Sequence, residues 1–242
     1  MADTSDIPND PHPTALSASL WSQGKIAARG IASLFRASPS GNPGGAIDAD
    51  VISEDTLRPK RIPPGQHETK KWPVLHAGTT PKVDLATWTL SVSGLVASPL
   101  TFSWPEFRTL QSHRVFADMH CVTRWSMLNN TWEGVLVSEV LKRLSLRPEA
   151  RFVRVVAEHG FTTNLPLSDF LSEDCLFAWS HNGKELDPDH GWPLRLVVPK
   201  LYAWKSAKWV RGVEFLEVDA PGFWEENGYH NHGDPWTQER FW

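Results

Sequence analysis

Short stretches in which apolar and polar residues alternate, rather than long helical periods, dominate the chain from Lys82 onward. Residues 88–92 alternate apolar side chains with hydroxyls, as a half-buried strand requires. Residues 152–156, 194–198 and 213–218 are similarly strand-like. Because these segments do not alternate with helices as βαβ units, the sequence predicts an α+β domain with mixed β-sheets rather than a doubly wound sheet.

The expected helices are short. Ser103, followed three residues later by Glu106, is a capping box and predicts a helix over residues 104–110. Ser168 is expected to cap a further helical turn. The Asn-Gly pair at 182–183 predicts a hairpin turn, since both residues tolerate positive φ.

The 242 residues suffice for one sizeable domain and a tail. Residues 1–56 are rich in Ser, Pro, Gly, Asp and Ala, which predicts a flexible N-terminal tail before a folded domain over residues 57–242. Apolar residues between positions 16 and 35 indicate a possible amphipathic helix in this tail. That helix would either dock loosely on the domain or lie on a membrane surface.

Charge and composition exclude several classes of protein. The net charge is −4, and no basic run suggests a nucleic-acid partner. No stretch approaches the roughly 20 apolar residues of a transmembrane segment. The first residues lack a secretion signal, and two cysteines form no disulfide framework. We therefore expect a cytoplasmic location.

The segment MHCVTRWS places Cys121 after a strand-like run over residues 114–119 and before a loop expected to end near Trp132. A lone cysteine is most often a small buried hydrophobe. Here, however, His120 and Arg124 would favour the thiolate, which is the form that binds a metal or attacks a substrate. Structural zinc is excluded by the absence of CxxC or HxxxH spacing in the sequence.

A second segment, DHGWPLRLVVP followed by WKSAKW, gathers a histidine, an arginine and two lysines around one predicted strand. An arginine fork and lysine point charges suit an anionic ligand, particularly a phosphate. Taken alone, the same pattern is also that of a solvated basic edge strand.

The two segments together resemble the molybdopterin domain of the sulfite oxidase family. The ordered motifs are Cys-Val-x-x-Trp-Ser, then His-Gly-x-Pro-Leu-Arg-Leu-Val-Val-Pro, then Lys-Ser-x-Lys-Trp, and the resemblance covers about residues 63–242. It is greatest to single-domain bacterial members, methionine-sulfoxide reductases among them. The resemblance implies the molybdopterin-domain fold of sulfite oxidases and a molybdopterin-dependent oxidoreductase.

The resemblance also implies residue roles. Cys121 would be the protein's sulfur ligand to the molybdenum of Mo-molybdopterin. Tyr229 would lie near the metal, unless it belongs simply to a C-terminal loop that covers the core. The residues that would contact the cofactor are Leu75, His76, His159, Thr162, His190, Arg195, Lys205, Ser206, Ala207 and Lys208.

One departure from the family bears on the substrate. Sulfite oxidases carry an arginine where this chain has Leu75, leaving Arg124 as the cation that the motif supplies. A doubly charged oxyanion needs more than one fixed cation when it is dehydrated. We therefore expect oxygen-atom transfer on a small or peptide-borne S-oxide or N-oxide. The alternatives are sulfite oxidation or a non-catalytic molybdopterin-binding protein. No haem or flavin motif is present, which implies a separate electron-transfer partner.

Overall fold

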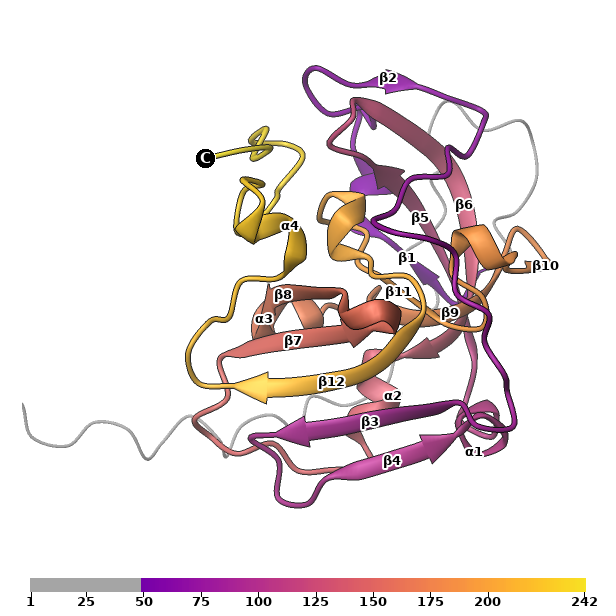
Figure 1. Ribbon diagram of the computed structural model, residues 1–242. Coiled ribbons are helices and arrows are strands. Elements are labelled where there is room, and N and C mark those ends of the chain that lie inside the picture. Colours follow the sequence, from indigo (N-terminus) through magenta and orange to yellow (C-terminus); the bar gives the residue numbers. More distant parts are fainter. Residues whose placement is uncertain (1–48) are drawn as a thin grey trace, which may run out of the picture. The chain divides into compact units, whose positions relative to one another are not determined.

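The computed structural model describes residues 49–242, which form two β-sheets with short helices around them (Figure 1). The first sheet has the order β1 (Val51–Ile52), β5 (His113–His120), β6 (Trp125–Leu136), β9 (Leu176–His181), β10 (Lys184–Glu185), with β2 (His67–Glu68) paired to β6 and β11 (Arg195–Val197) paired to β9. The second has the order β4 (Leu100–Ser103), β3 (Thr89–Gly94), β12 (Val210–Leu216), β7 (Phe152–Ala157), β8 (Thr162–Pro166).

The helices are one or two turns long. They are α1 (Trp104–Arg108), α2 (Val137–Leu141), α3 (Leu167–Phe170), α4 (Phe223–Glu226) and the 3-10 turns η1 (Glu54–Leu57), η2 (Glu158–Gly160), η3 (Pro188–His190) and η4 (Ala203–Lys205). Both sheets are mixed: β1 pairs parallel to β5 and β3 pairs parallel to β12, whereas β5–β6 and β7–β12 are antiparallel. The predicted α+β class is confirmed.

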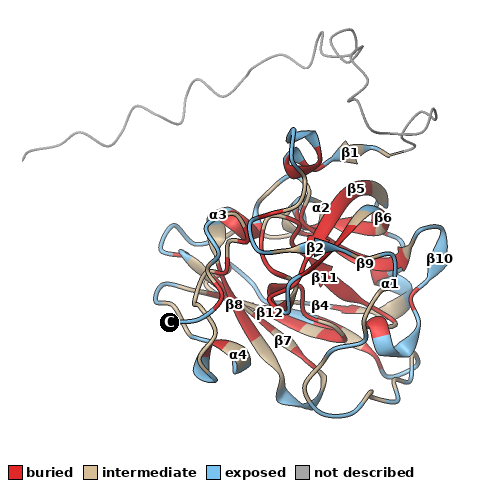
Figure 2. Cartoon of the chain, turned by 90° about the horizontal axis from the view of Figure 1, so that it is seen from above, coloured by how far each residue is buried: buried red, intermediate tan, exposed pale blue. Residues whose placement is uncertain are grey.

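Two clusters of buried side chains hold this arrangement together. The larger combines residues of both sheets, such as Leu90 on β3 and Phe177 on β9, and therefore fills the space between them. The second includes Met119 and Cys121 with Trp132 and Tyr202. Figure 2 shows β5, β6 and β9 largely in the colour of buried residues. Cys121 thus directly follows the buried C-terminal end of β5.

Several local predictions are confirmed. Ser103 donates from its backbone N–H and its hydroxyl to Glu106 Oε2, at 2.8 and 2.7 Å, which closes the capping box of α1. Asn182 and Gly183 join β9 to β10 with positive φ at both positions.

Two local predictions are wrong. Ser168 lies inside α3, which follows Pro166, and does not cap it. The loop expected to reach Trp132 ends at Arg124, because β6 already begins at Trp125. Ser126 and Asn130 of β6 are fully buried. The other polar residues of this strand, Asn129, Thr131 and Glu133, are exposed or partly exposed, in a long hairpin with β5.

The predicted domain boundary at residue 57 is also too late. Val51–Ile52 pairs with β5, and the backbone N–H of Ser53 donates to Phe116 O at 2.9 Å. Asp55 and Thr56 are buried. A two-residue strand has no period from which it could be detected in the sequence. The expected tail helix lies within residues 1–48, outside the described residues.

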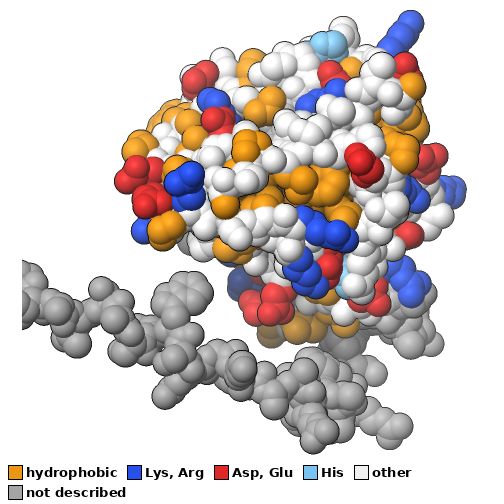
Figure 3. Space-filling model, turned by 90° about the horizontal axis from the view of Figure 1, so that it is seen from below, with side chains coloured by type: hydrophobic (Ala, Val, Ile, Leu, Met, Phe, Trp, Pro, Cys, Tyr) orange, Lys and Arg blue, Asp and Glu red, His pale blue; other side chains and the backbone are white. Residues whose placement is uncertain are grey.

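The described surface carries charges of both signs. On the face seen in Figure 3, acidic and basic side chains are interspersed around hydrophobic ones. Among the described helices, none is both long enough and apolar enough to cross a bilayer.

Gly94 offers a test of the packing between β3 and β12. Its φ is +81°, and a Cβ at this position would lie 2.2 Å from the carbonyl oxygen of Phe215. Gly183 is a matched control, since its φ is +75° and nothing lies within 4 Å of the added Cβ. Chemical denaturation should show that Gly183→Ala loses about 1 kcal/mol of unfolding free energy through backbone strain. Gly94→Ala should lose about 1–3 kcal/mol more through overpacking. Equal losses would contradict the register of these two strands.

Candidate active site

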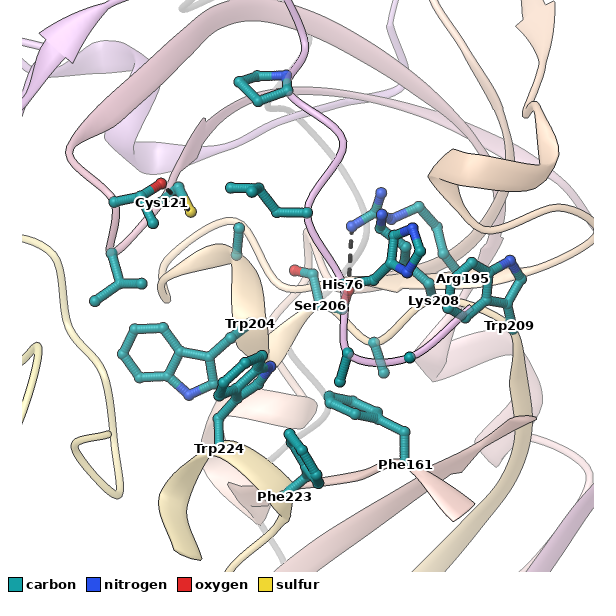
Figure 4. Close-up of a pocket in the computed structure, with 18 of the residues that line it drawn as sticks. His76, Cys121, Phe161, Arg195, Trp204, Ser206, Lys208, Trp209, Phe223 and Trp224 are labelled. Carbon is teal, nitrogen blue, oxygen red and sulfur yellow. Dashed lines mark hydrogen bonds between the residues drawn. The ribbon is translucent and has the colours of Figure 1, made fainter. Parts of the chain in front are cut away.

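A cavity of about 400 Å³ is lined by segments that lie far apart in the sequence. These are the connection from β2 to β3, the turn after β5, η2, the region around η4, and α4 with the loop after it. Figure 4 shows Cys121 on one side of this cavity and Arg195, His76 and Lys208 on the other, with Trp204 and Trp224 along a further wall. The nine expected site residues that line it are Leu75, His76, Cys121, His159, Arg195, Ser206, Ala207, Lys208 and Tyr229.

Cys121 occupies the tight turn that joins β5 to β6. Its backbone N–H donates to Trp125 O at 2.9 Å, and its carbonyl accepts from the N–H of Arg124 at 3.0 Å. Gln66 Nε2 donates to the same carbonyl at 3.1 Å, and the Thr123 hydroxyl lies 3.2 Å from Sγ. A thiol held in this way at a cavity wall presents a soft, polarisable sulfur that, once deprotonated, can bind a transition metal.

The electrostatic environment of Cys121 differs from the sequence prediction. Burial raises the pKa of its thiol, and the Thr123 hydrogen bond and the charge of Arg240 act in the opposite direction. Burial also lowers the pKa of His120 to about 4, so this histidine is neutral at pH 7. Arg124 is exposed. The predicted activation of the thiol by His120 and Arg124 is therefore wrong.

Arg195 forms the cationic wall opposite the cysteine. It is 2% exposed, and its guanidinium donates to the carbonyl oxygens of His190 (3.0 Å) and Ser206 (3.1 Å). Burial lowers its pKa to about 9. Within residues 49–242, its hydrogen bonds go to carbonyl oxygens and not to carboxylates.

Lys208 adds a second cation to the same wall. Its Nζ donates to Asp189 O at 2.6 Å, and burial, together with the charge of Arg195, lowers its pKa to about 7. Gly191 allows the two cations to approach, because a Cβ there would lie 3.0 Å from Arg195 Cβ and 3.2 Å from Lys208 Cβ. An anionic group, such as a phosphate, stabilises the charged forms of two neighbouring cations whose pKa values are depressed. The residues present therefore fit an anionic, metal-bearing cofactor.

Four expected site residues do not line the cavity: Arg124, Thr162, His190 and Lys205. Arg124 is exposed on the Cys121 turn, where its φ is +73°. Thr162 lies on β8, where its carbonyl is packed beneath Gly222. His190 stacks on Trp72 at 3.9 Å between ring centroids and lies one layer behind Arg195, which binds its carbonyl oxygen.

Lys205 does not line the cavity, and the prediction that it contacts the cofactor is wrong. Its side chain is fully buried, and Nζ lies 2.6 Å from Oε1 of Glu225, whose side chain is also fully buried. The same ammonium donates to the carbonyl oxygens of Asn164 (2.9 Å) and Asn231 (2.6 Å). Lys205 thus joins β8, η4, α4 and the loop that follows α4.

The aromatic wall of the cavity was missed by the sequence analysis. Trp204 donates through Nε1 to Glu225 Oε1 at 2.8 Å, and Gly233 packs so closely that a Cβ there would lie 2.6 Å from the Trp204 ring. Tyr229 stacks on Trp224 at 4.8 Å and meets Trp204 edge-on at 5.1 Å. The twelve tryptophans from Trp72 onward were the available signal, but composition does not say which of them share a wall.

Replacing Lys205 tests whether the buried pair holds this wall. Lys205→Met should lower the free energy of unfolding by about 3–5 kcal/mol, because Glu225 is left buried without a counter-ion. Lys205→Met/Glu225→Gln should recover part of the loss, since the amide still accepts from Trp204. Lys142→Met is the control: it breaks an exposed pair with Glu139 and should cost less than about 1 kcal/mol. Similar losses in Lys205→Met and Lys142→Met would contradict the role assigned to the pair.

The depressed pKa of Lys208 predicts a pH dependence of anion binding. Below pH 7 the ammonium is charged, and above pH 7 it is mostly neutral. Sulfate, which stays doubly charged throughout, should therefore bind the cofactor-free protein more weakly as the pH rises from about 6 to about 8. Calorimetric titration would measure this. In Lys208→Met the affinity should be low and should vary little over this pH range, in which Arg195, with its pKa of about 9, stays mostly charged. An unchanged pH dependence in that variant would assign the titration to another group.

A known protein family matches this chain. The family model for the oxidoreductase molybdopterin binding domain matches residues 77–224, more than half of the chain. The uncharacterized oxidoreductase YuiH of Bacillus subtilis (strain 168) is 48% identical over 182 residues, which are 75% of this chain and 92% of that protein.

More distant relatives are longer proteins. The protein-methionine-sulfoxide reductase catalytic subunit MsrP of Campylobacter jejuni is 27% identical over 64% of this chain and 59% of its own length. Sulfite oxidase of Arabidopsis thaliana is 27% identical over 63% of this chain, so that the chain spans about half (48%) of that relative.

A solved structure shares the fold. The sulfane dehydrogenase SoxCD from Paracoccus pantotrophus superposes with a TM-score of 0.53 at 22% identity, covering 57% of this chain and 40% of that one. The matched domain and the 48% identical relative place this chain in the sulfite oxidase family of molybdopterin-binding oxidoreductases.

Proposed function

We propose that the cavity holds Mo-molybdopterin and that the protein transfers an oxygen atom from a small or peptide-borne S-oxide or N-oxide. The observation that carries this proposal is that one cavity is lined by the thiol of Cys121 and, opposite, by the cations Arg195 and Lys208. A thiolate suits the metal, and the cations suit the anionic end of the cofactor.

Five of the cavity residues would hold the group. Cys121 would bind the metal, and Arg195 and Lys208 would bind the phosphate end, with Ser206 and Ala207 between them along the chain. Lys208, which is only partly protonated in the empty site near pH 7, would gain its full charge when an anion binds. When bound, the cofactor supplies a two-electron redox centre at which oxygen transfer takes place.

Tyr229 would act on the substrate. It lines the cavity, and burial raises the pKa of its hydroxyl, so that the hydroxyl stays protonated at neutral pH. A protonated phenol donates a hydrogen bond, which would orient the polarised oxygen of a sulfoxide or N-oxide. The stacked ring of Trp224 and the edge-on ring of Trp204 fix its direction.

The cavity favours a neutral substrate. Leu75 lines it with 49% of its surface exposed, and Arg124 does not line it. Phe223 and Trp224 add apolar surface that suits a substituent on sulfur or nitrogen. A sulfite dianion would lose its hydration here without a cation of its own, because Arg195 and Lys208 would already bind the cofactor. Relatives named as protein-methionine-sulfoxide reductase catalytic subunits support a sulfoxide.

A separate protein would supply the electrons. The sequence has no haem or flavin motif, and relatives are named as catalytic subunits, which implies a further subunit in those systems. Both points support an external electron donor for this chain.

Metal analysis and a substrate comparison test the proposal. Purified protein should contain about one molybdenum per chain, and Cys121→Ser should lose turnover while remaining folded, because an alkoxide is a harder ligand. Cys175→Ala, at a buried cysteine outside the cavity lining, should retain turnover.

With an artificial electron donor or acceptor, methionine sulfoxide or trimethylamine N-oxide should give a higher kcat/KM than sulfite. Turnover in Cys121→Ser would remove that residue from the site, and a kcat/KM for sulfite about tenfold higher than for the oxides would overturn the substrate class.

A further inference from the structure

Arg240 is a buried cation that the reaction proposed above does not use. It is 7% exposed and lies near the end of the chain, yet its guanidinium reaches the turn of Cys121. One terminal nitrogen donates to Val122 O at 2.7 Å, and the other lies 3.4 Å from Pro64 O. Nε is buried without a hydrogen-bond partner.

The charge of Arg240 is not neutralised by a carboxylate. Other arginines pair with acids, as Arg61 does with Asp118 and Arg154 with Glu214, but within residues 49–242 Arg240 forms no ion pair. The ring of Tyr202 lies 5.1 Å from the guanidinium carbon. Because an unpaired buried cation is costly, an anionic neighbour is needed to offset it.

The neighbouring group that would be anionic is the metal site at Cys121. Val122, which accepts the shorter hydrogen bond, follows Cys121 directly in the chain. Gln66, which donates to the Cys121 carbonyl, lies two residues after Pro64 in the segment that precedes β2. Arg240 and this segment therefore both contact the Cys121 turn.

We propose that Arg240 is a positioning residue that locks the Cys121 turn and raises the reduction potential of the molybdenum centre through its uncompensated charge. The proposal rests on the proposed function, because it needs a metal at Cys121. A fixed positive charge in a low-dielectric interior stabilises the more negative, reduced form of a nearby centre. The planar fork holds the Val122 carbonyl, which a lysine would hold less rigidly.

Three variants separate the effect of the positive charge of Arg240 from that of the hydrogen bonds its guanidinium forms. Arg240→Lys keeps the charge, Arg240→Gln keeps a hydrogen-bond donor, and Arg240→Met keeps neither. Arg143→Met, at an exposed arginine outside the cavity lining, is the control. The midpoint potential of molybdenum would be followed by electron paramagnetic resonance during a redox titration, in samples matched for metal content. Hydrogen exchange of the amides of residues 121–125 would be measured on the same proteins.

We expect the midpoint potential to fall in Arg240→Gln and Arg240→Met and to stay close to the wild-type value in Arg240→Lys and Arg143→Met. Amide exchange of the turn should be several-fold faster in Arg240→Met than in the wild type. A wild-type potential in Arg240→Gln overturns the proposal, even if Arg240→Met fails to fold. Unchanged exchange in the folded variants overturns the positioning role. Wild-type protein that binds no molybdenum would instead overturn the proposed function.

Discussion

The ammonium of Lys205 and the carboxylate of Glu225 meet in the interior, where neither is reached by solvent. Through this contact the C-terminal segment is fixed to the elements that precede it, since Lys205 also binds backbone carbonyls of β8 and of the loop after α4. Glu225 holds the indole of Trp204 in turn. The aromatic wall, and the direction of Tyr229 within it, follow from this single pair, because α4 is one turn long and could not hold its position alone.

Buried positive charge is the second organising feature. Arg195, Lys208 and Arg240 lie around the cavity or the cysteine turn, and their hydrogen bonds in the described chain go to carbonyl oxygens. Such an arrangement is unfavourable in an empty protein and favourable around an anion. The depressed pKa of Lys208 expresses this cost directly. These cations therefore fit an anionic ligand, whose binding would offset their desolvation.

Local sequence patterns predicted much of the fold and part of the site. The alternation of residues 88–92, the capping box at Ser103 and the Asn-Gly turn depend on neighbours in the chain, and each was found in the structure. The motif around Cys121 and that around Arg195 likewise identified residues that line one cavity.

The rest depended on contacts between distant segments. The burial of Lys205 comes from Glu225, twenty positions later, and that of Arg240 from Val122, more than a hundred positions earlier. Neither partner is marked by spacing. A two-residue strand such as β1 exists because β5 offers it a free edge, which no local pattern records. The residues that sequence reasoning misplaced are thus those whose direction is decided by tertiary pairing.

X-ray absorption at the molybdenum edge, recorded on wild-type protein and on Cys121→Ser, tests the central claim most directly. We predict one sulfur scatterer fewer around the metal in the variant, because Cys121 would be the ligand that the protein supplies. The same number of sulfur neighbours in both proteins, or wild-type protein free of molybdenum, would contradict it.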